Sequence, residues 1–218
     1  MLYMIMSELT PDELLTTTRS VRLRLDLTRP VERKVIEECV TIAAQAPNAF
    51  QEIYFVIVAD EHKRASLAEI YRKGSVSFFE SARAQVAKGS GNPARDALAR
   101  RVLESGLYLR EHLHEVPVHV IPCVAGRTEG APLLVQTGRW GSVFPAAWSF
   151  MLAGRARGLG MTFTSLHLNF EKEAAELLGI PYNEVMQAGL LPVAYYKGSK
   201  FKLGSRPPLA RTVHWDGW

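Results

Sequence analysis

Two arginines lie close together near the start of the chain, directly after a predicted helix, as Arg19 and Arg22 with Ser20 between them. A guanidinium group is a rigid fork of N–H donors that matches phosphate oxygens, and a helix terminus supplies further N–H groups. The same spacing also occurs on ordinary solvated helix faces, so the motif needs support from elsewhere. Arg206, in a second basic segment near the far end of the chain, offers it. If both segments meet on one phosphate, the protein binds a phosphorylated cofactor.

Two further polar segments could contact a heteroaromatic ring. Asn48 and Gln51 lie in a loop before a predicted strand, and their amides can both donate and accept hydrogen bonds. Thr164 and Ser165 lie near the end of another predicted strand, where hydroxyl and backbone N–H groups could face a ring nitrogen or carbonyl. An ordinary polar loop and the β-propensity of threonine are the plainer explanations of these two segments.

Other familiar chemistries are not indicated. The chain has no Gly-x-Ser-x-Gly elbow, no Gly-x-x-x-x-Gly-Lys-Ser/Thr loop and no His-Glu-x-x-His pair. His112 and His114 are two residues apart on a predicted helix, so they point to different faces and predict no metal site. Cys39 and Cys123 lie in apolar stretches and are predicted to be buried thiols.

Composition narrows the class of protein. The 218 residues, 47% of them hydrophobic, predict one globular domain over residues 1–218. The 26 basic and 22 acidic residues are interspersed, which disfavours nucleic acid as a partner and suits small anionic ligands. Two cysteines, no signal peptide and no apolar run of ~18 residues predict a cytoplasmic protein without a membrane span.

The elements that would position these residues follow from caps and periodicity. Thr10, with Pro11 and Glu13 behind it, predicts a helix start. An apolar stripe predicts a second helix from Pro30 to Ala46, before a proline that ends it. Further helices are expected over residues 61–72, 93–115, 140–158 and 171–178, and buried strands over residues 53–59, 116–125, 161–168 and 184–196.

Residues 73–92 are predicted to be less regular, because glycines punctuate them. With Phe78 and Phe79 expected to be exposed, this stretch suits a mobile lid over a pocket, or equally a plain surface excursion. Residues 73–115 together would form a lid and helical excursion.

The last residues, 197–218, lack periodicity and end with Trp215 and Trp218. Large apolar side chains are not normally left in water at a terminus. Burial against a second subunit is the favoured explanation, and folding back onto the parent domain is the alternative.

In order and spacing, these segments resemble the FMN-dependent nitroreductase family over nearly the whole chain. The family opens with an Arg-Ser-x-Arg phosphate motif, matched by residues 19–22, with Thr18 where a second arginine is common. The opening and the His-Trp-x-x-Trp end look like an actinobacterial branch. The other matching segments are the Ala-Pro to Asn-x-Gln loop at 46–51, the small-residue helix ending in Gly-Leu-Gly at 145–160, the flavin-facing segment at 162–168, the last strand at 191–195 and the closing arginine segment at 206–209.

The resemblance implies an α+β fold, a three-layer α-β-α sandwich with a mixed, mostly antiparallel sheet. It implies an obligate homodimer that exchanges C-terminal arms and holds FMN at its interface. It also implies an NAD(P)H oxidoreductase that passes electrons by a ping-pong reaction from NADH or NADPH to a nitroaromatic, quinone or similar small-molecule acceptor. Because the cofactor carries the chemistry, we name no catalytic acid, base or nucleophile.

The resemblance also implies roles for the polar segments. The phosphate would be held by Arg19, Ser20, Arg22 and Arg206, the ring or ribityl chain would be bordered by Asn48 and Gln51, and the ring nitrogen that accepts hydride would lie near Thr164 and Ser165.

One departure concerns the loop before the first strand. The Ala-Pro loop is shorter than usual, Ile53 replaces a common tryptophan, and Glu52 adds a carboxylate near the expected ring position. Two alternatives therefore stay open: a non-catalytic flavin-binding or sequestering protein of the same fold, and a variant that carries out reductive dehalogenation or oxidises a heterocycle.

Overall fold

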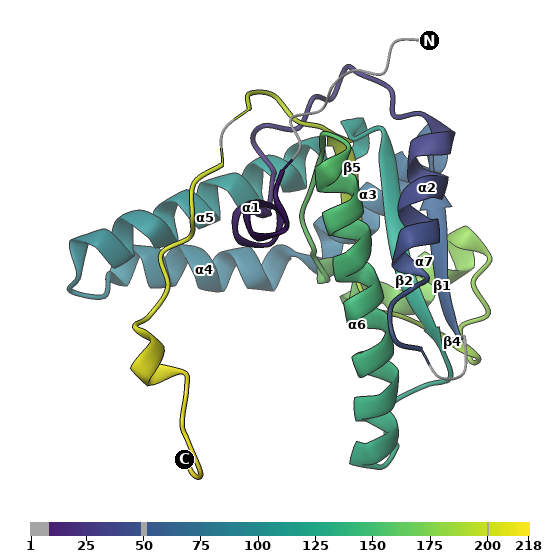
Figure 1. The fold of residues 1–218 in the computed structure, drawn as a ribbon. Helices are drawn as coiled ribbons and strands as arrows, with labels where there is room; N and C mark the ends of the chain where they lie inside the picture. Colours follow the sequence, from purple (N-terminus) through teal and green to yellow (C-terminus); the bar gives the residue numbers. More distant parts are fainter. Residues whose placement is uncertain (1–8, 49–51, 200) are drawn as a thin grey trace.

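The computed structural model describes residues 9–48, 52–199 and 201–218. An open, five-stranded sheet lies at its centre (Figure 1). Each described pair of neighbouring strands is antiparallel, in agreement with the mostly antiparallel sheet expected from the resemblance. The strand order is β1 (Ile53–Val58), β2 (Val118–Ala125), β5 (Leu191–Tyr195) and β3 (Leu159–Met161), and β4 (Val185–Gln187) pairs with β2 beside β5.

The central strand β2 is buried along almost its whole length, as its mainly apolar sequence predicts, and His119 is buried with it. Val118 and Val120 belong to a core shared with α2 (Arg33–Ala43) and α6 (Leu133–Ala156). The alternate positions Ile121 and Cys123 belong to a second core, shared with α3 (Glu61–Gly74) and α7 (Glu171–Leu178). Because successive side chains of a strand point to opposite faces, helices cover both sides of the sheet. The three-layer arrangement is confirmed.

The first helix, α1 (Pro11–Thr17), begins where its cap predicts. The Glu13 N–H donates to Thr10 Oγ1 at 3.2 Å, and the Thr10 N–H donates back to Glu13 Oε2 at 2.9 Å. Such reciprocal bonds satisfy backbone donors that the first helical turn leaves without partners. The helix ends at Thr17, just before Arg19 and Arg22.

Two other helices differ at their ends from the prediction. α2 begins at Arg33 rather than Pro30, because the chain stays extended through Glu32, whose carboxylate accepts from the Tyr195 hydroxyl at 2.7 Å. α6 begins at Leu133, directly after Pro132, and therefore starts earlier than the helix expected from residue 140.

Residues 73–92 are mostly helical, and the expectation of an irregular stretch was wrong. Gly74 is the last residue of α3 rather than a break, and after Ser75 the chain continues as α4 (Val76–Lys88). The side chain of Ser75 is buried and its hydroxyl donates to the Arg72 carbonyl at 2.8 Å. Packing at this junction therefore keeps the chain helical, although the glycine alone predicts a break.

The next helix, α5 (Pro93–His112), packs against α4 to form a helical hairpin that projects from the sheet (Figure 1). Phe79 is buried in this contact, because Gly106 has no side chain and leaves room for the ring. Phe78 is exposed, as predicted, and Phe79 is not.

The strand expected over residues 161–168 is much shorter. β3 ends at Met161, after which Thr164 keeps a single antiparallel bridge to Leu190 and the chain turns into the 3-10 helix η2 (Leu166–Phe170). The expected last strand is likewise divided, because β4 and β5 pair with opposite ends of β2. The polar segment thus lies in a bend beside the sheet and not within it.

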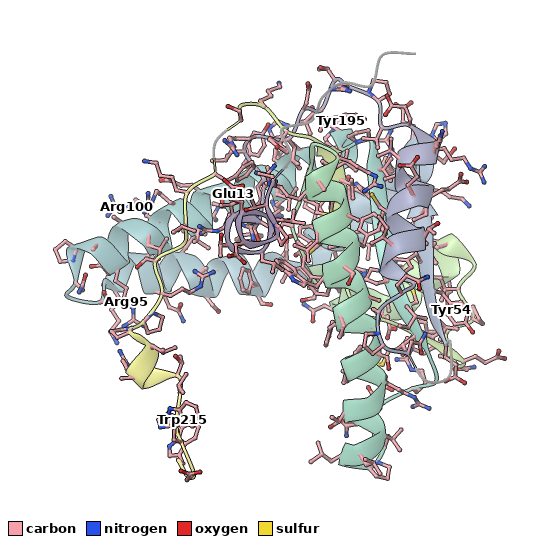
Figure 2. All side chains as sticks on the ribbon, viewed as in Figure 1. Glu13, Tyr54, Arg95, Arg100, Tyr195 and Trp215 are labelled. Carbon is pink, nitrogen blue, oxygen red and sulfur yellow. The ribbon has the colours of Figure 1, made fainter. Side chains whose placement is uncertain are left out.

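The C-terminal segment does not bury its two tryptophans against the rest of the chain. Residues 201–218 extend away from the sheet with one short 3-10 turn, η3 (Leu209–Arg211) (Figure 1). Trp215 is 86% exposed and Trp218 is fully exposed, near the far end of this segment (Figure 2). In a single chain, the side chains of Trp215 and Trp218 are therefore not buried against the domain. No helix in the described ranges is long and apolar enough to cross a membrane.

A close approach between α3 and η2 positions the polar bend. A Cβ atom on Gly74 would overlap the Leu166 carbonyl oxygen, and Asn169 Nδ2 donates to the Gly74 carbonyl at 2.7 Å. The backbones can approach this closely only because Gly74 lacks a side chain. The contact brings Tyr71, one turn earlier in α3, beside Thr164.

We predict that Gly74→Ala lowers the free energy of unfolding by about 1–3 kcal/mol, because the new methyl group must push η2 away from α3. Urea denaturation measures the change. Gly141→Ala is the matched control: it lies inside α6, and its new Cβ would meet nothing within 4 Å. The control should be as stable as wild type, or more stable by up to ~1 kcal/mol. A Gly74→Ala protein as stable as the control would contradict the close contact.

Candidate functional site

The two basic segments from opposite ends of the chain meet. Arg19, Ser20, Arg22 and Arg206 line one cavity of about 760 Å³. The Arg19 Nη1 donates to the carbonyl oxygen of Lys202 at 3.1 Å, which joins residues 183 positions apart. The expected meeting of the first motif with Arg206 is therefore present within one chain.

A glycine makes room for the two guanidinium groups. A Cβ on Gly204 would lie 2.5 Å from Arg206 Nη1 and 3.0 Å from Arg19 Nη1. Any side chain at this position would displace one arginine or both. The result is a cluster of N–H donors of the kind that binds a phosphate through charge-assisted hydrogen bonds.

Arg22 is partly buried between this cavity and a second one. Burial lowers the pKa of its guanidinium, and the nearby Tyr71 opposes this shift. Its side chain has no hydrogen bond or ion pair with any residue in the described ranges. A desolvated cation without a partner is costly, so an anionic ligand here would be stabilised.

Besides Thr18 and two polar residues of α5, Arg101 and Ser105, the rest of the cavity wall is apolar and comes from three elements. Phe144 and Trp148 of α6 are 43% and 41% exposed, unusual for large rings on a core helix. Phe163 comes from the bend after β3, and Val102 comes from α5. An apolar wall beside a cluster of phosphate donors suits a planar ring that carries a phosphorylated tail.

Thr164 and Ser165 line the second cavity, of about 840 Å³, which shares Arg22 and Phe163 with the first. Its remaining walls come mainly from α4 and α5. Thr164 is partly buried, and its Oγ1 lies 3.1 Å from the Tyr71 hydroxyl, whereas Ser165 is exposed. The polar bend is therefore next to the arginine cluster, because Arg22 lines both cavities.

The described residues at the ends of the loop before β1, Asn48 and Glu52, are not brought to this site. Asn48 lines none of the cavities described here, and its Oδ1 accepts from the Glu52 N–H at 3.4 Å. Gln51 lies outside the described residues. Glu52 is exposed, and its carbonyl accepts from the Ala125 N–H at 2.9 Å.

Tyr71 is a site residue that the sequence did not indicate. It is almost completely buried on the apolar face of α3, so its position in the sequence indicates only a core residue. Burial raises the pKa of its phenol, more than the hydrogen bond to Thr164 and the charge of Arg22 lower it. The phenol is therefore protonated at neutral pH.

Two buried histidines nearby cannot serve as ordinary acid–base groups. Burial lowers the pKa of His119 and of His167 to about 4, so both are neutral at pH 7. Neither ring nitrogen of His167 has a hydrogen-bond partner in the described part of the chain. That part also contains no group of three side chains that could hold a metal ion.

Several solved structures share this fold. Oxidised iodotyrosine deiodinase bound to FMN and 3-iodo-L-tyrosine aligns with a TM-score of 0.69 and 20% identity, over 95% of this chain and 99% of that one. A BluB-like flavoprotein from Clostridium difficile 630 aligns with 0.69 and 16%, over 94% and 98%. Nitroreductase A from Vibrio parahaemolyticus RIMD 2210633 aligns with 0.66 and 17%, over 95% and 75%. No curated protein matches the sequence.

The sequence itself matches a family model. The model of the Nitroreductase family matches residues 15–195, which include the first phosphate motif, the whole sheet and the polar bend. The match covers most of the chain, which therefore belongs to the nitroreductase family.

Proposed function

We propose that this protein is an FMN-dependent NAD(P)H oxidoreductase that reduces nitroaromatic, quinone or similar acceptors. Family membership supports a flavin-dependent oxidoreductase in general. The observation that carries the finer proposal is the cluster of Arg19, Ser20, Arg22 and Arg206 on one cavity with an apolar wall. These donors fit the doubly charged phosphate of FMN, and the apolar wall fits its ring.

In this proposal the phosphate lies against Arg19, Arg206 and the Ser20 hydroxyl, and it neutralises Arg22. Charge-assisted hydrogen bonds of this kind are about twice as strong as neutral ones. When bound, FMN accepts a hydride from NADH or NADPH and passes the electrons to the acceptor. The protein contributes binding, orientation and exclusion of water.

The ring would lie toward the second cavity, near Thr164 and Ser165. Both residues line this cavity, which shares Arg22, Val102 and Phe163 with the first. A donor beside the ring nitrogen that accepts hydride stabilises the charge of the reduced flavin. The α4–α5 hairpin, which forms the outer walls of this cavity, would cover the acceptor and act as the lid.

We also propose a homodimer in which C-terminal segments are exchanged. Phe144 and Trp148 on α6 and Trp215 and Trp218 in the tail are all at least 41% exposed in one chain. Contact with a second copy would bury these rings. It would also give Asn48 a role, because the loop before β1 could reach the partner's ring site.

The two cysteines fit a reducing compartment, and we propose a cytoplasmic location. Cys39 and Cys123 are both free and buried. Burial raises the pKa of Cys39 to about 11 and that of Cys123 to about 12, so neither is a reactive thiolate.

The alternative is a flavin-binding protein that does not turn over. The regular α4–α5 hairpin beside the cavity of Thr164 favours it, because a fixed cover would bar NADH and NADPH from the ring.

Arg19→Ala and Arg206→Ala should each weaken FMN binding by about 10- to 150-fold, because each removes ~1.5–3 kcal/mol of charged hydrogen bonding. Fluorescence titration measures this, and riboflavin, which lacks the phosphate, should lose little affinity. Arg100→Ala is the control, an exposed arginine on α5 (Figure 2) that lines neither cavity. If FMN and riboflavin affinities fall equally, the phosphate assignment is wrong.

Turnover is tested by mixing the FMN-loaded protein with NADH or NADPH under anaerobic conditions. An oxidoreductase loses the visible absorbance of oxidised flavin within seconds to minutes and regains it when a quinone is added. Persistent colour with both nicotinamides contradicts the enzyme and supports the sequestering alternative. A protein that binds no FMN at all contradicts both.

Light scattering should give twice the mass of one chain. Replacing Trp215 and Trp218 together by alanine should shift the protein toward monomer, since the two exposed rings would no longer be buried by a partner. Ile57→Ala on β1 is a control that removes an exposed apolar group elsewhere. Monomeric wild-type protein would contradict the exchange of tails.

A further inference from the structure

A partly buried hydroxyl pair lies where α3 meets the polar bend. The Tyr71 hydroxyl and Thr164 Oγ1 are 3.1 Å apart, and both residues line the cavity of about 840 Å³. Tyr71 is only 2% exposed. Within the described ranges, neither hydroxyl has another hydrogen-bond partner. The direction of this one bond therefore decides where the remaining hydrogen points.

The surrounding charges favour Tyr71 as the donor. Two cations, Arg22 and Arg110, lie close enough to lower the pKa of its phenol, against the larger effect of burial. A nearby positive charge favours loss of the phenol hydrogen, so it makes Tyr71 a stronger hydrogen-bond donor. A phenol is also the more acidic of the two hydroxyl groups and hence the better donor.

The backbone of Thr164 has no freedom to change this arrangement. Its N–H donates to the Leu190 carbonyl at 3.0 Å, and its carbonyl accepts from the Leu190 N–H at 2.7 Å. With the backbone held and Oγ1 already accepting from Tyr71, the hydroxyl hydrogen of Thr164 must point away from Tyr71. The open side is the cavity that both residues line.

We propose that Tyr71 is a positioning residue that makes Thr164 Oγ1 a fixed hydrogen-bond donor to the flavin ring. The inference rests on the proposed function, because it requires FMN in the adjoining cavities. Tyr71 would act through Thr164 and not touch the reacting atoms itself. Without the phenol, the Thr164 hydroxyl could rotate and would no longer be held as a donor.

The readout is the ratio of affinities for reduced and oxidised FMN, obtained from the midpoint potential of the bound flavin. Tyr71→Phe keeps the ring and removes only the hydroxyl. We expect the ratio to fall about 2- to 10-fold, the equivalent of one neutral hydrogen bond. The affinity for oxidised FMN should change by a smaller factor than this ratio does. Tyr182→Phe is the control, a partly buried tyrosine packed on Arg127 and absent from the cavity.

A double-mutant cycle with Thr164→Val separates positioning from a general structural effect. If Tyr71 acts through Thr164, Tyr71→Phe changes the ratio in wild type and leaves it unchanged in the Thr164→Val background. Thr164→Ser keeps the hydroxyl and should restore most of the effect of Tyr71. Additive effects on the ratio would overturn the inference, because Tyr71 would then act independently of Thr164.

A second variant guards against misfolding of Tyr71→Phe. Fluorinated tyrosine at position 71 keeps the ring and hydroxyl and makes the phenol a stronger donor, so the ratio should rise. An unchanged or lower ratio overturns the inference. If wild-type protein binds FMN but neither Tyr71 variant moves the ratio, the inference fails and the proposed function stands. If wild-type protein binds no FMN, both fail.

Discussion

Unpaired positive charge is the constraint on which the site depends. Arg19 and Arg206 both lie against Gly204, and Arg22 is partly buried without a carboxylate partner among the described residues. Like charges repel, and desolvation adds to the cost of holding them together. The rest of the fold offsets that cost, and in the proposed function a bound phosphate relieves it.

Aromatic contacts hold the C-terminal segment in place against this repulsion. Two guanidinium groups pack on the Phe201 ring. The Cζ atoms of Arg24 and Arg155 lie 4.1 Å and 4.2 Å from the centroid of this ring. Its edge also packs on the Tyr196 ring, with centroids 4.9 Å apart. Cation–π contacts of this kind are stronger when they are shielded from water. They fix the chain just before Lys202, whose carbonyl accepts from Arg19.

The second half of the site depends on packing instead of charge. α3 ends in a glycine pressed against the backbone of η2, and this contact fixes the distance between Tyr71 and Thr164. The α4–α5 hairpin starts from the same junction, because only Ser75 separates α3 from α4. The walls of the cavity and the orientation of the polar bend are therefore set by one close helix contact.

The sequence by itself determined the features whose causes lie within a few residues: the cap at Thr10, the buried run of β2 and the donors at Arg19, Ser20 and Arg22. The sequence did not predict α4, because Gly74 looks like a helix break. It also predicted too long a strand over residues 161–168, because these residues have high β-propensity. Only the tertiary structure decided that Arg19 meets Lys202 and that Tyr71 meets Thr164. Those contacts join residues 183 and 93 positions apart, so packing across the domain creates them and no local pattern encodes them.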